Sequence, residues 1–182
     1  MSVPIAFGLG SNLGDPLANL AAGATELASS FEGVELSSVY VTAPVGGPPQ
    51  PDYLNAVLVA QAPDASEAVA RRALALAHEV EASLHRTREV RWGPRTLDID
   101  LLAVGGLQLD AEDIRVPHPR AAQRAFVLVP WAEVAPEAMI PGTGAVAAAL
   151  AALAEPELQS VRLFDSPTVL GISALRSRRR AE

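Results

Sequence analysis

Apolar residues near the N-terminus form a strand-like run that is followed by a turn. Residues 3–9 are mostly apolar and predict a first strand. Asp15 is then suited to cap a helix, and Pro16 has the fixed backbone angle that is favoured at the first helical position. We therefore expect a helix that runs to about Ser29.

Two further strands are predicted on either side of a long irregular connection. Residues 34–41 and 53–61 are rich in apolar and β-branched side chains. The segment between them, residues 43–52, contains prolines and glycines that exclude regular structure. Long ordered connections in compact domains are often binding loops, so we expect this one to face a ligand.

A second helix and a fourth strand follow. Asp64 and Glu67 have the spacing of an approximate capping box. After them, apolar residues recur at helical spacing at Val69, Ala73, Leu76, Val80 and Leu84. A polar, arginine-rich loop at residues 85–95 separates this helix from a strand at residues 96–104.

The order strand, helix, strand, strand, helix, strand predicts an α+β fold with a ferredoxin-like core. We expect an antiparallel sheet in one layer and the helices packed on it in the other. An alanine-rich segment near residues 144–154 predicts a C-terminal helical extension. One domain should occupy residues 1–165, and residues 166–182 should form a flexible tail.

Composition and charge exclude several classes of protein. The net charge of -7 disfavours general binding to nucleic acids or membrane surfaces, because both are polyanions. The longest weakly polar run, residues 145–154, is far shorter than the roughly 20 apolar residues that span a bilayer. Cysteine is absent, which excludes a thiolate zinc site and a cysteine nucleophile. We therefore expect a cytoplasmic protein that binds neither nucleic acids nor membranes. Separately, we expect a monomer whose partners are small molecules.

All 14 basic residues are arginine, and seven of them fall within residues 86–124. The absence of lysine excludes a phosphate-binding loop of the kind that requires one. Arginine, with its planar fork of donors, is then the strong anion-binding side chain available to this protein.

Asp98 and Asp100 lie in the last predicted strand, where residues two apart point to the same face. Two carboxylates placed this way, with Cα atoms roughly 6 to 7 Å apart, could share hard cations such as Mg²⁺. A structural ion pair with Arg91 or Arg95 explains the pair equally well. However, four arginines fall in the ten residues 86–95, and they would repel one another unless an anion gathered them. That context favours a metal and polyphosphate site.

Four motifs occur in the order typical of one enzyme family. They are GLGSNLGD, YVTAPVG with QPDYLNA, WGPRTLDIDLL, and VPHP followed by RAFVLVP. Together they resemble the 6-hydroxymethyl-7,8-dihydropterin pyrophosphokinases of folate biosynthesis, over residues 5 to about 140. The resemblance implies transfer of pyrophosphate from ATP to the hydroxymethyl group of the pterin, which gives the pterin diphosphate and AMP.

The resemblance also implies roles for individual residues. Asp98 and Asp100 would hold two Mg²⁺ ions. The catalytic residues would be Arg86, Arg95, Asp98 and Asp100. The residues implied to bind ATP are Glu81, Arg88, Trp92, His118 and Arg124. The pterin would contact Thr42, Pro44, Val45, Tyr53, Asn55 and Phe126, while Leu101 is assigned no role.

Without the resemblance, other interpretations stay open. His118 lies between Pro117 and Pro119 and could be a rigid loop residue, and Glu81 could be a solvent-facing charge on a helix. A two-metal phosphodiesterase or nuclease could be built on the same pair of aspartates. A ferredoxin-like fold could also belong to a nucleotide-binding module that has no catalytic activity.

Overall fold

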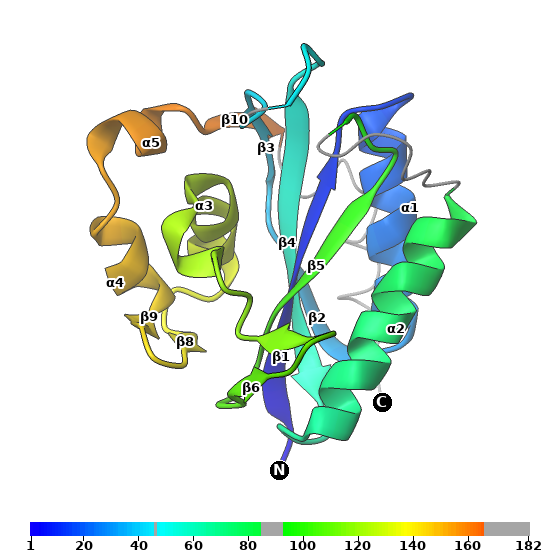
Figure 1. Cartoon of the computed structure of the whole chain (residues 1–182), viewed down its shortest axis with the longest axis vertical. Coiled ribbons are helices and arrows are strands. Elements are labelled where there is room, and N and C mark those ends of the chain that lie inside the picture. The colour runs from blue at the N-terminus through cyan, green and yellow to red at the C-terminus, as the bar shows by residue number, and fades with distance from the viewer. Residues whose placement is uncertain (46, 85–92, 166–182) are drawn as a thin grey trace, which may run out of the picture.

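A computed structural model describes residues 1–45, 47–84 and 93–165 (Figure 1). The first part contains β1 (Val3–Ser11), α1 (Pro16–Ser29), β2 (Glu32–Leu36), β3 (Val39–Thr42), β4 (Tyr53–Ala62) and α2 (Glu67–Ser83). The second part contains β5 (Asp98–Val104), β6 (Leu109–Asp110), β7 (Arg115–Val116), the 3-10 helix η1 (Ala121–Gln123), α3 (Ala125–Val134), β8 (Met139–Ile140), β9 (Gly144–Ala145), α4 (Val146–Ala151), α5 (Glu155–Gln159) and β10 (Arg162–Asp165).

An antiparallel sheet forms the centre of the molecule. Its strand order is β10-β3-β4-β1-β5, and β2 also pairs with β4. The path through β1, α1, β3, β4, α2 and β5 has the strand and helix order of a ferredoxin-like fold. The predicted α+β class and antiparallel sheet are therefore confirmed.

Helices cover both faces of the sheet, so the prediction of helices on one side was wrong. Helices α1 and α2 pack on one face, over a core that includes Phe7 and Leu58. Helices α3 and α4 pack on the opposite face, where Leu128 and Trp131 are almost fully buried (Figure 1). The central strands are apolar on both sides, and a sheet of that kind needs a cover on each face.

The two long helices begin at side-chain caps. Asp15 Oδ1 accepts a hydrogen bond from Ala18 N at 3.0 Å, as predicted for α1. In α2 the cap is Ser66, whose Oγ accepts from Val69 N at 3.3 Å. The predicted cap Asp64 instead accepts from Ser66 N at 2.9 Å and holds the turn that precedes the helix.

The buried face of α2 is rotated from the predicted one. Its buried residues are Ala70, Ala73, Ala77, Val80 and Glu81. Val69 and Leu76, which we expected to face the core, are only partly buried. Small alanine side chains let the helix lie close to the sheet, and the larger residues then pack at its flanks. The burial of a charged residue, Glu81, on this face bears on the functional site.

The predicted strand at residues 34–41 is two strands in the structure. β2 and β3 both pair with β4, and residues 37 and 38 separate them. At this break Ser37 Oγ accepts a hydrogen bond from Val57 N at 2.9 Å, so a side chain satisfies a β4 backbone N–H that would otherwise bond a neighbouring strand.

The C-terminal extension is helical in part. The helix predicted near residues 144–154 is shorter, because α4 ends at Ala151 and α5 follows after a break. β10 then pairs with β3 and covers that edge of the sheet. The predicted tail, residues 166–182, lies outside the described residues. Within the described ranges, no helix is both long enough and apolar enough to cross a membrane.

Candidate active site

Residues from four neighbouring strands form a row across the sheet. Tyr40 of β3 pairs with Asn55 of β4. Asn55 also pairs with Gly10 of β1, and Gly10 pairs with Asp98 of β5. Neighbouring residues such as Leu9 point into the α1 and α2 core, so the row faces α3. The amide of Asn55 and the carboxylate of Asp98 therefore lie on one surface, with a glycine between them.

Asp98 and Asp100 project from the same face of β5, as predicted. Asp98 accepts a hydrogen bond from the guanidinium group of Arg95. Asp100 Oδ2 lies 3.9 Å from His118 Nε2 and 4.0 Å from Arg124 Nη1. The structure thus gathers two carboxylates, two arginines and a histidine at the end of β5.

Burial is the main influence on the ionisation of Asp100. Desolvation, followed by the charge of Asp98, raises the pKa of Asp100, while His118, Arg124 and Arg95 oppose that rise. The folded protein therefore disfavours a second negative charge beside Asp98. A bound cation would remove this repulsion.

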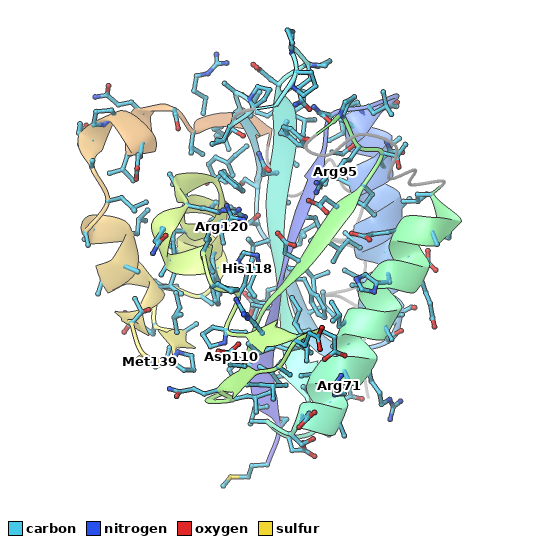
Figure 2. The ribbon with its side chains drawn as sticks, viewed as in Figure 1. Arg71, Arg95, Asp110, His118, Arg120 and Met139 are labelled. Carbon is cyan, nitrogen blue, oxygen red and sulfur yellow. The ribbon has the colours of Figure 1, made fainter. Side chains whose placement is uncertain are left out.

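His118 is oriented by its own backbone and by a neighbouring loop residue. His118 N donates to Leu102 O at 2.8 Å, which holds the residue beside β5, and Figure 2 shows it between α3 and that strand. Arg120 N donates to Nδ1 at 3.2 Å, so Nε2 carries the proton of the neutral ring and faces Asp100. Desolvation lowers the pKa of His118, and the charges of Arg124 and Arg120 lower it further against the opposing effect of Asp100.

The side chain of Asn12 connects three segments around this cluster. Asn12 is only 2% exposed, and its Nδ2 donates to Gln50 Oε1 at 2.9 Å and to Pro51 O at 3.0 Å. Its Oδ1 accepts from Arg95 N at 2.8 Å, and its own N donates to Arg95 O at 3.1 Å. One amide therefore ties the end of β1 to the loop before β4 and to the arginine that contacts Asp98.

We predict that Asn12→Ala lowers kcat/KM by about 100-fold, because a displacement of about 1 Å in a catalytic group can cost that much. The substitution removes the side-chain bonds to Arg95 N and to the loop containing Gln50, while the backbone bond from residue 12 to Arg95 O remains. Steady-state kinetics with ATP and the pterin, the two substrates that the resemblance implies, measures the effect. Asn19→Ala is the matched control, because Asn19 bonds Leu13 O at 2.9 Å but neither loop. Equal turnover in the two variants would show that the connection has no catalytic role.

Several residues implied to contact the pterin are brought together on the α3 face. Asn55 Nδ2 donates to Thr42 Oγ1 at 2.8 Å, and both residues are buried. The hydroxyl of Tyr53 donates to Gln50 Oε1 at 3.2 Å. Phe126 is in the first turn of α3, where its ring centroid lies 5.4 Å from Arg124 Cζ. These contacts place amide, hydroxyl and aromatic groups near the carboxylate cluster.

Other residues implied by the resemblance lie elsewhere or are not described. Val45 is 82% exposed and Pro44 is partly buried, on the loop that leaves β3. Their part in a pterin wall stays a prediction. Arg86, Arg88 and Trp92 lie outside the described residues.

Glu81 differs from the solvent-facing charge that its position on a helix suggested. It is 3% exposed, and its Oε1 accepts a hydrogen bond from Ile99 N at 2.8 Å. Ile99 lies between Asp98 and Asp100, so this carboxylate holds the backbone from which both aspartates project. Contact of Glu81 with ATP stays a prediction.

Glu133, for which the sequence suggested no role, joins α3 to β3. Its two carboxylate oxygens each lie 3.0 Å from Ser38 N, which donates to them, and Oε1 also accepts from Ser38 Oγ at 2.9 Å. The hydroxyl of Tyr40 donates to Oε2 at 2.9 Å. Burial and this carboxylate raise the pKa of Tyr40 to about 12. Glu133 thereby fixes the helix that carries Phe126 relative to the strand that carries Thr42.

Comparison with known proteins identifies the family. Residues 6–136 match the 7,8-dihydro-6-hydroxymethylpterin-pyrophosphokinase (HPPK) family. The chain belongs to this family. A 2-amino-4-hydroxy-6-hydroxymethyldihydropteridine pyrophosphokinase of Methylorubrum extorquens is 43% identical over 138 residues, which cover 74% of this chain and 84% of the relative. One of Mycobacterium bovis is 38% identical over 172 residues, with 88% of this chain and 89% of the relative covered.

Solved structures support the same fold. An HPPK-DHPS in complex with substrates has a TM-score of 0.61 at 9% identity and covers 82% of this chain. A Plasmodium falciparum HPPK-DHPS with pteroate has a TM-score of 0.60 at 10% identity and covers 83% of this chain. The chain spans less than half the length of these two proteins, 43% and 44% respectively. At this identity the likeness establishes the HPPK fold alone.

Proposed function

We propose that the cluster at the end of β5 carries out the reaction of the HPPK family. In this reaction the hydroxymethyl oxygen of 6-hydroxymethyl-7,8-dihydropterin forms a bond to the β-phosphorus of ATP. The bond from that phosphorus to the oxygen shared with the α-phosphate breaks, the hydroxyl loses its proton, and AMP leaves. The observation that supports this most directly is the shared surface of Asp98, Asp100, Arg95 and Asn55.

The carboxylates fit divalent cations of the magnesium type. Asp98 and Asp100 offer hard oxygen ligands from one face of β5. Burial and the charge of Asp98 raise the pKa of Asp100, so a bound cation would stabilise its charged form. No cluster of three or more potential metal-ligating side chains occurs among the described residues, so phosphate and water oxygens would complete the coordination. We propose that the two aspartates hold two Mg²⁺ ions, which would neutralise charge that develops on the phosphates.

Side chains of this chain would position the triphosphate. Arg95 can place a planar fork of donors on a phosphate, and its backbone is held by Asn12. His118 Nε2 and Arg124 Nη1 approach Asp100 from the α3 side, where both can donate to phosphate oxygens. Donors that are already oriented before the reaction lose little energy in reorganisation. Arg86, Arg88 and Trp92 would add nucleotide contacts.

The pterin would lie on the α3 side of the row that contains Asn55. This amide can read the hydrogen-bonding edge of a flat heterocycle, and Phe126 and Tyr53 offer aromatic surfaces for stacking. We also propose that the protein acts as a monomer.

We expect AMP and the pterin diphosphate, without ADP, when the protein is incubated with ATP, Mg²⁺ and 6-hydroxymethyl-7,8-dihydropterin. Phosphorus-31 NMR distinguishes the two products, because attack at the β-phosphorus releases AMP and attack at the γ-phosphorus releases ADP. Reactions without the pterin or without Mg²⁺ are the controls. Formation of ADP, or no reaction at all, would overturn the proposal.

The other interpretations of the aspartate pair are disfavoured. A nuclease does not require the amide and aromatic groups on the α3 face, and the net charge of -7 opposes a polyanionic substrate. A nucleotide-binding module without activity would bind ATP and Mg²⁺ but release no AMP. The product experiment therefore separates this module from the enzyme.

A further inference from the structure

Gly10 occupies the middle of the row that joins the two halves of the proposed site. It pairs with Asn55 on one side and with Asp98 on the other. Neighbouring strands are about 4.8 Å apart, so the backbones that carry the amide and the carboxylate are separated by roughly 10 Å. With no side chain at position 10, the surface between them carries no side-chain atoms from β1 at this position.

Backbone conformation does not explain why this residue is glycine. Gly10 lies in a regular strand, and its φ is outside the left-handed region that favours glycine. Space explains it better, because a Cβ atom here would lie 3.3 Å from Asn55 Oδ1 and 3.8 Å from Tyr53 Cδ1. Gly8, two residues earlier on the same face, differs in the kind of neighbour, since its Cβ would meet Leu102 Cδ2, the end of an apolar side chain, at 3.4 Å.

Asn55 cannot easily move away from such a methyl group. Its Nδ2 is bonded to Thr42 Oγ1 at 2.8 Å, and the residue is only 6% exposed. This bond fixes the orientation of the amide and directs Oδ1 toward Gly10. Among the hydrogen bonds of the described residues, none is made to Oδ1. Oδ1 is not among the buried polar atoms that lack a hydrogen-bond partner, so it lies at an accessible surface, and an oriented acceptor there is suited to receive a donor from a ligand.

We infer that Gly10 determines access of the pterin to Asn55. This inference rests on the proposed function and adds a specificity-determining position to it. A methyl group at position 10 would cover Oδ1 and exclude the N–H donor of a flat heterocycle. The nucleotide, which would contact the β5 and α3 side of the row, would be affected much less.

The experiment measures pterin and nucleotide binding separately. Calorimetry with 6-hydroxymethyl-7,8-dihydropterin, in the presence of Mg²⁺ and a non-hydrolysable ATP analogue, gives the pterin Kd. The analogue alone with Mg²⁺ gives the nucleotide Kd. For Gly10→Ala we expect the pterin Kd to rise at least about tenfold, the scale of one lost hydrogen bond. The nucleotide Kd should change less than about twofold.

A double-mutant cycle distinguishes this role from general damage to the fold. In the Asn55→Ala background the acceptor is absent, so adding Gly10→Ala should change the pterin Kd by less than about twofold. Gly106→Ala is the control for a glycine-to-alanine change, since its Cβ would meet nothing within 4 Å. It should bind both ligands like the wild type.

Each outcome separates this inference from the proposed function. If the wild type binds no pterin, the proposed function fails. If the wild type binds pterin and Gly10→Ala binds it equally well, only the role of Gly10 is overturned. Equal losses of pterin affinity from Gly10→Ala in both backgrounds would also overturn it, because the effect would then not pass through Asn55.

Discussion

Replacing Asp100 by asparagine is expected to abolish turnover while it raises the melting temperature of the metal-free protein. The loss in kcat should be at least about 1000-fold, the scale found when one preorganised charge-stabilising group is removed. Stability should rise because desolvation and the charge of Asp98 penalise the Asp100 carboxylate in the folded state. Asparagine keeps the shape of the side chain and removes that charge.

The stability gain of Asp100→Asn should be largest near neutral pH and smaller at acidic pH. The folded-state pKa of Asp100 is raised, so the folded protein binds this proton more tightly than the unfolded chain does. The penalty is therefore fully present above the folded-state pKa and is relieved as the pH falls through it. Thermal melts in metal-free buffer should show the greatest advantage of Asp100→Asn near neutral pH. The advantage should shrink toward acidic pH.

Asp110→Asn is the matched control for these measurements. Asp110 is an exposed carboxylate that pairs with Arg115 at 2.8 Å on the β6 and β7 hairpin, which follows the opposite end of β5 from Asp98. Its substitution should leave turnover and melting temperature nearly unchanged, since exposed ion pairs contribute little. A large loss of stability in Asp100→Asn would instead indicate a structural ion pair. That result would contradict a metal-binding role.

Replacing Arg95 by lysine is expected to lower kcat by about 1000-fold, within the range attributed to arginines that stabilise transferring phosphoryl groups. Lysine keeps the positive charge but lacks the planar fork that can contact the Asp98 carboxylate and a phosphate together. Because Asn12 holds the backbone of residue 95 and not its side chain, the backbone should stay in place. The defect should therefore lie in the chemical step more than in nucleotide binding.

Single-turnover kinetics and calorimetry separate these two effects. The rate constant of the chemical step should fall steeply in Arg95→Lys, while the Kd for the ATP analogue with Mg²⁺ rises by less than about tenfold. Arg115→Lys, at an exposed ion pair, is the control and should match the wild type in both. If Arg95→Lys kept the wild-type rate, charge alone would be sufficient and the geometry of the guanidinium would have no special part.

Helix caps, turn residues and the spacing of apolar residues predicted the strands and the long helices well, because these features depend on residues close together in the chain. Asp15 and Pro16 mark the start of α1, and the α1 boundaries are those that the sequence indicated. The alternation in β5 correctly placed Asp98 and Asp100 on one face. A cap or a two-residue repeat depends on residues close in sequence, so the sequence shows it directly.

Contacts that depend on distant partners were not predicted. In the sequence Glu81 resembles any charged residue on a helix. Only the fold brings its carboxylate within hydrogen-bonding distance of Ile99 N. Glu133 bonds Ser38, which is 95 positions away, and no local pattern links the two. Asn12 lies in a recognisable motif, but its bonds to Gln50 and Arg95 require segments that only folding brings together.

The sequence by itself determined the class of the fold, the family and the carboxylate pair on one strand, because periodicity, turn residues and motif order are properties of the chain. Only the tertiary structure decided that helices cover both faces of the sheet. It also decided that strand pairing sets Asn55, Gly10 and Asp98 in one row. The physical reason is that register and layer packing are set by contacts between residues far apart in sequence, which burial and hydrogen bonding select together.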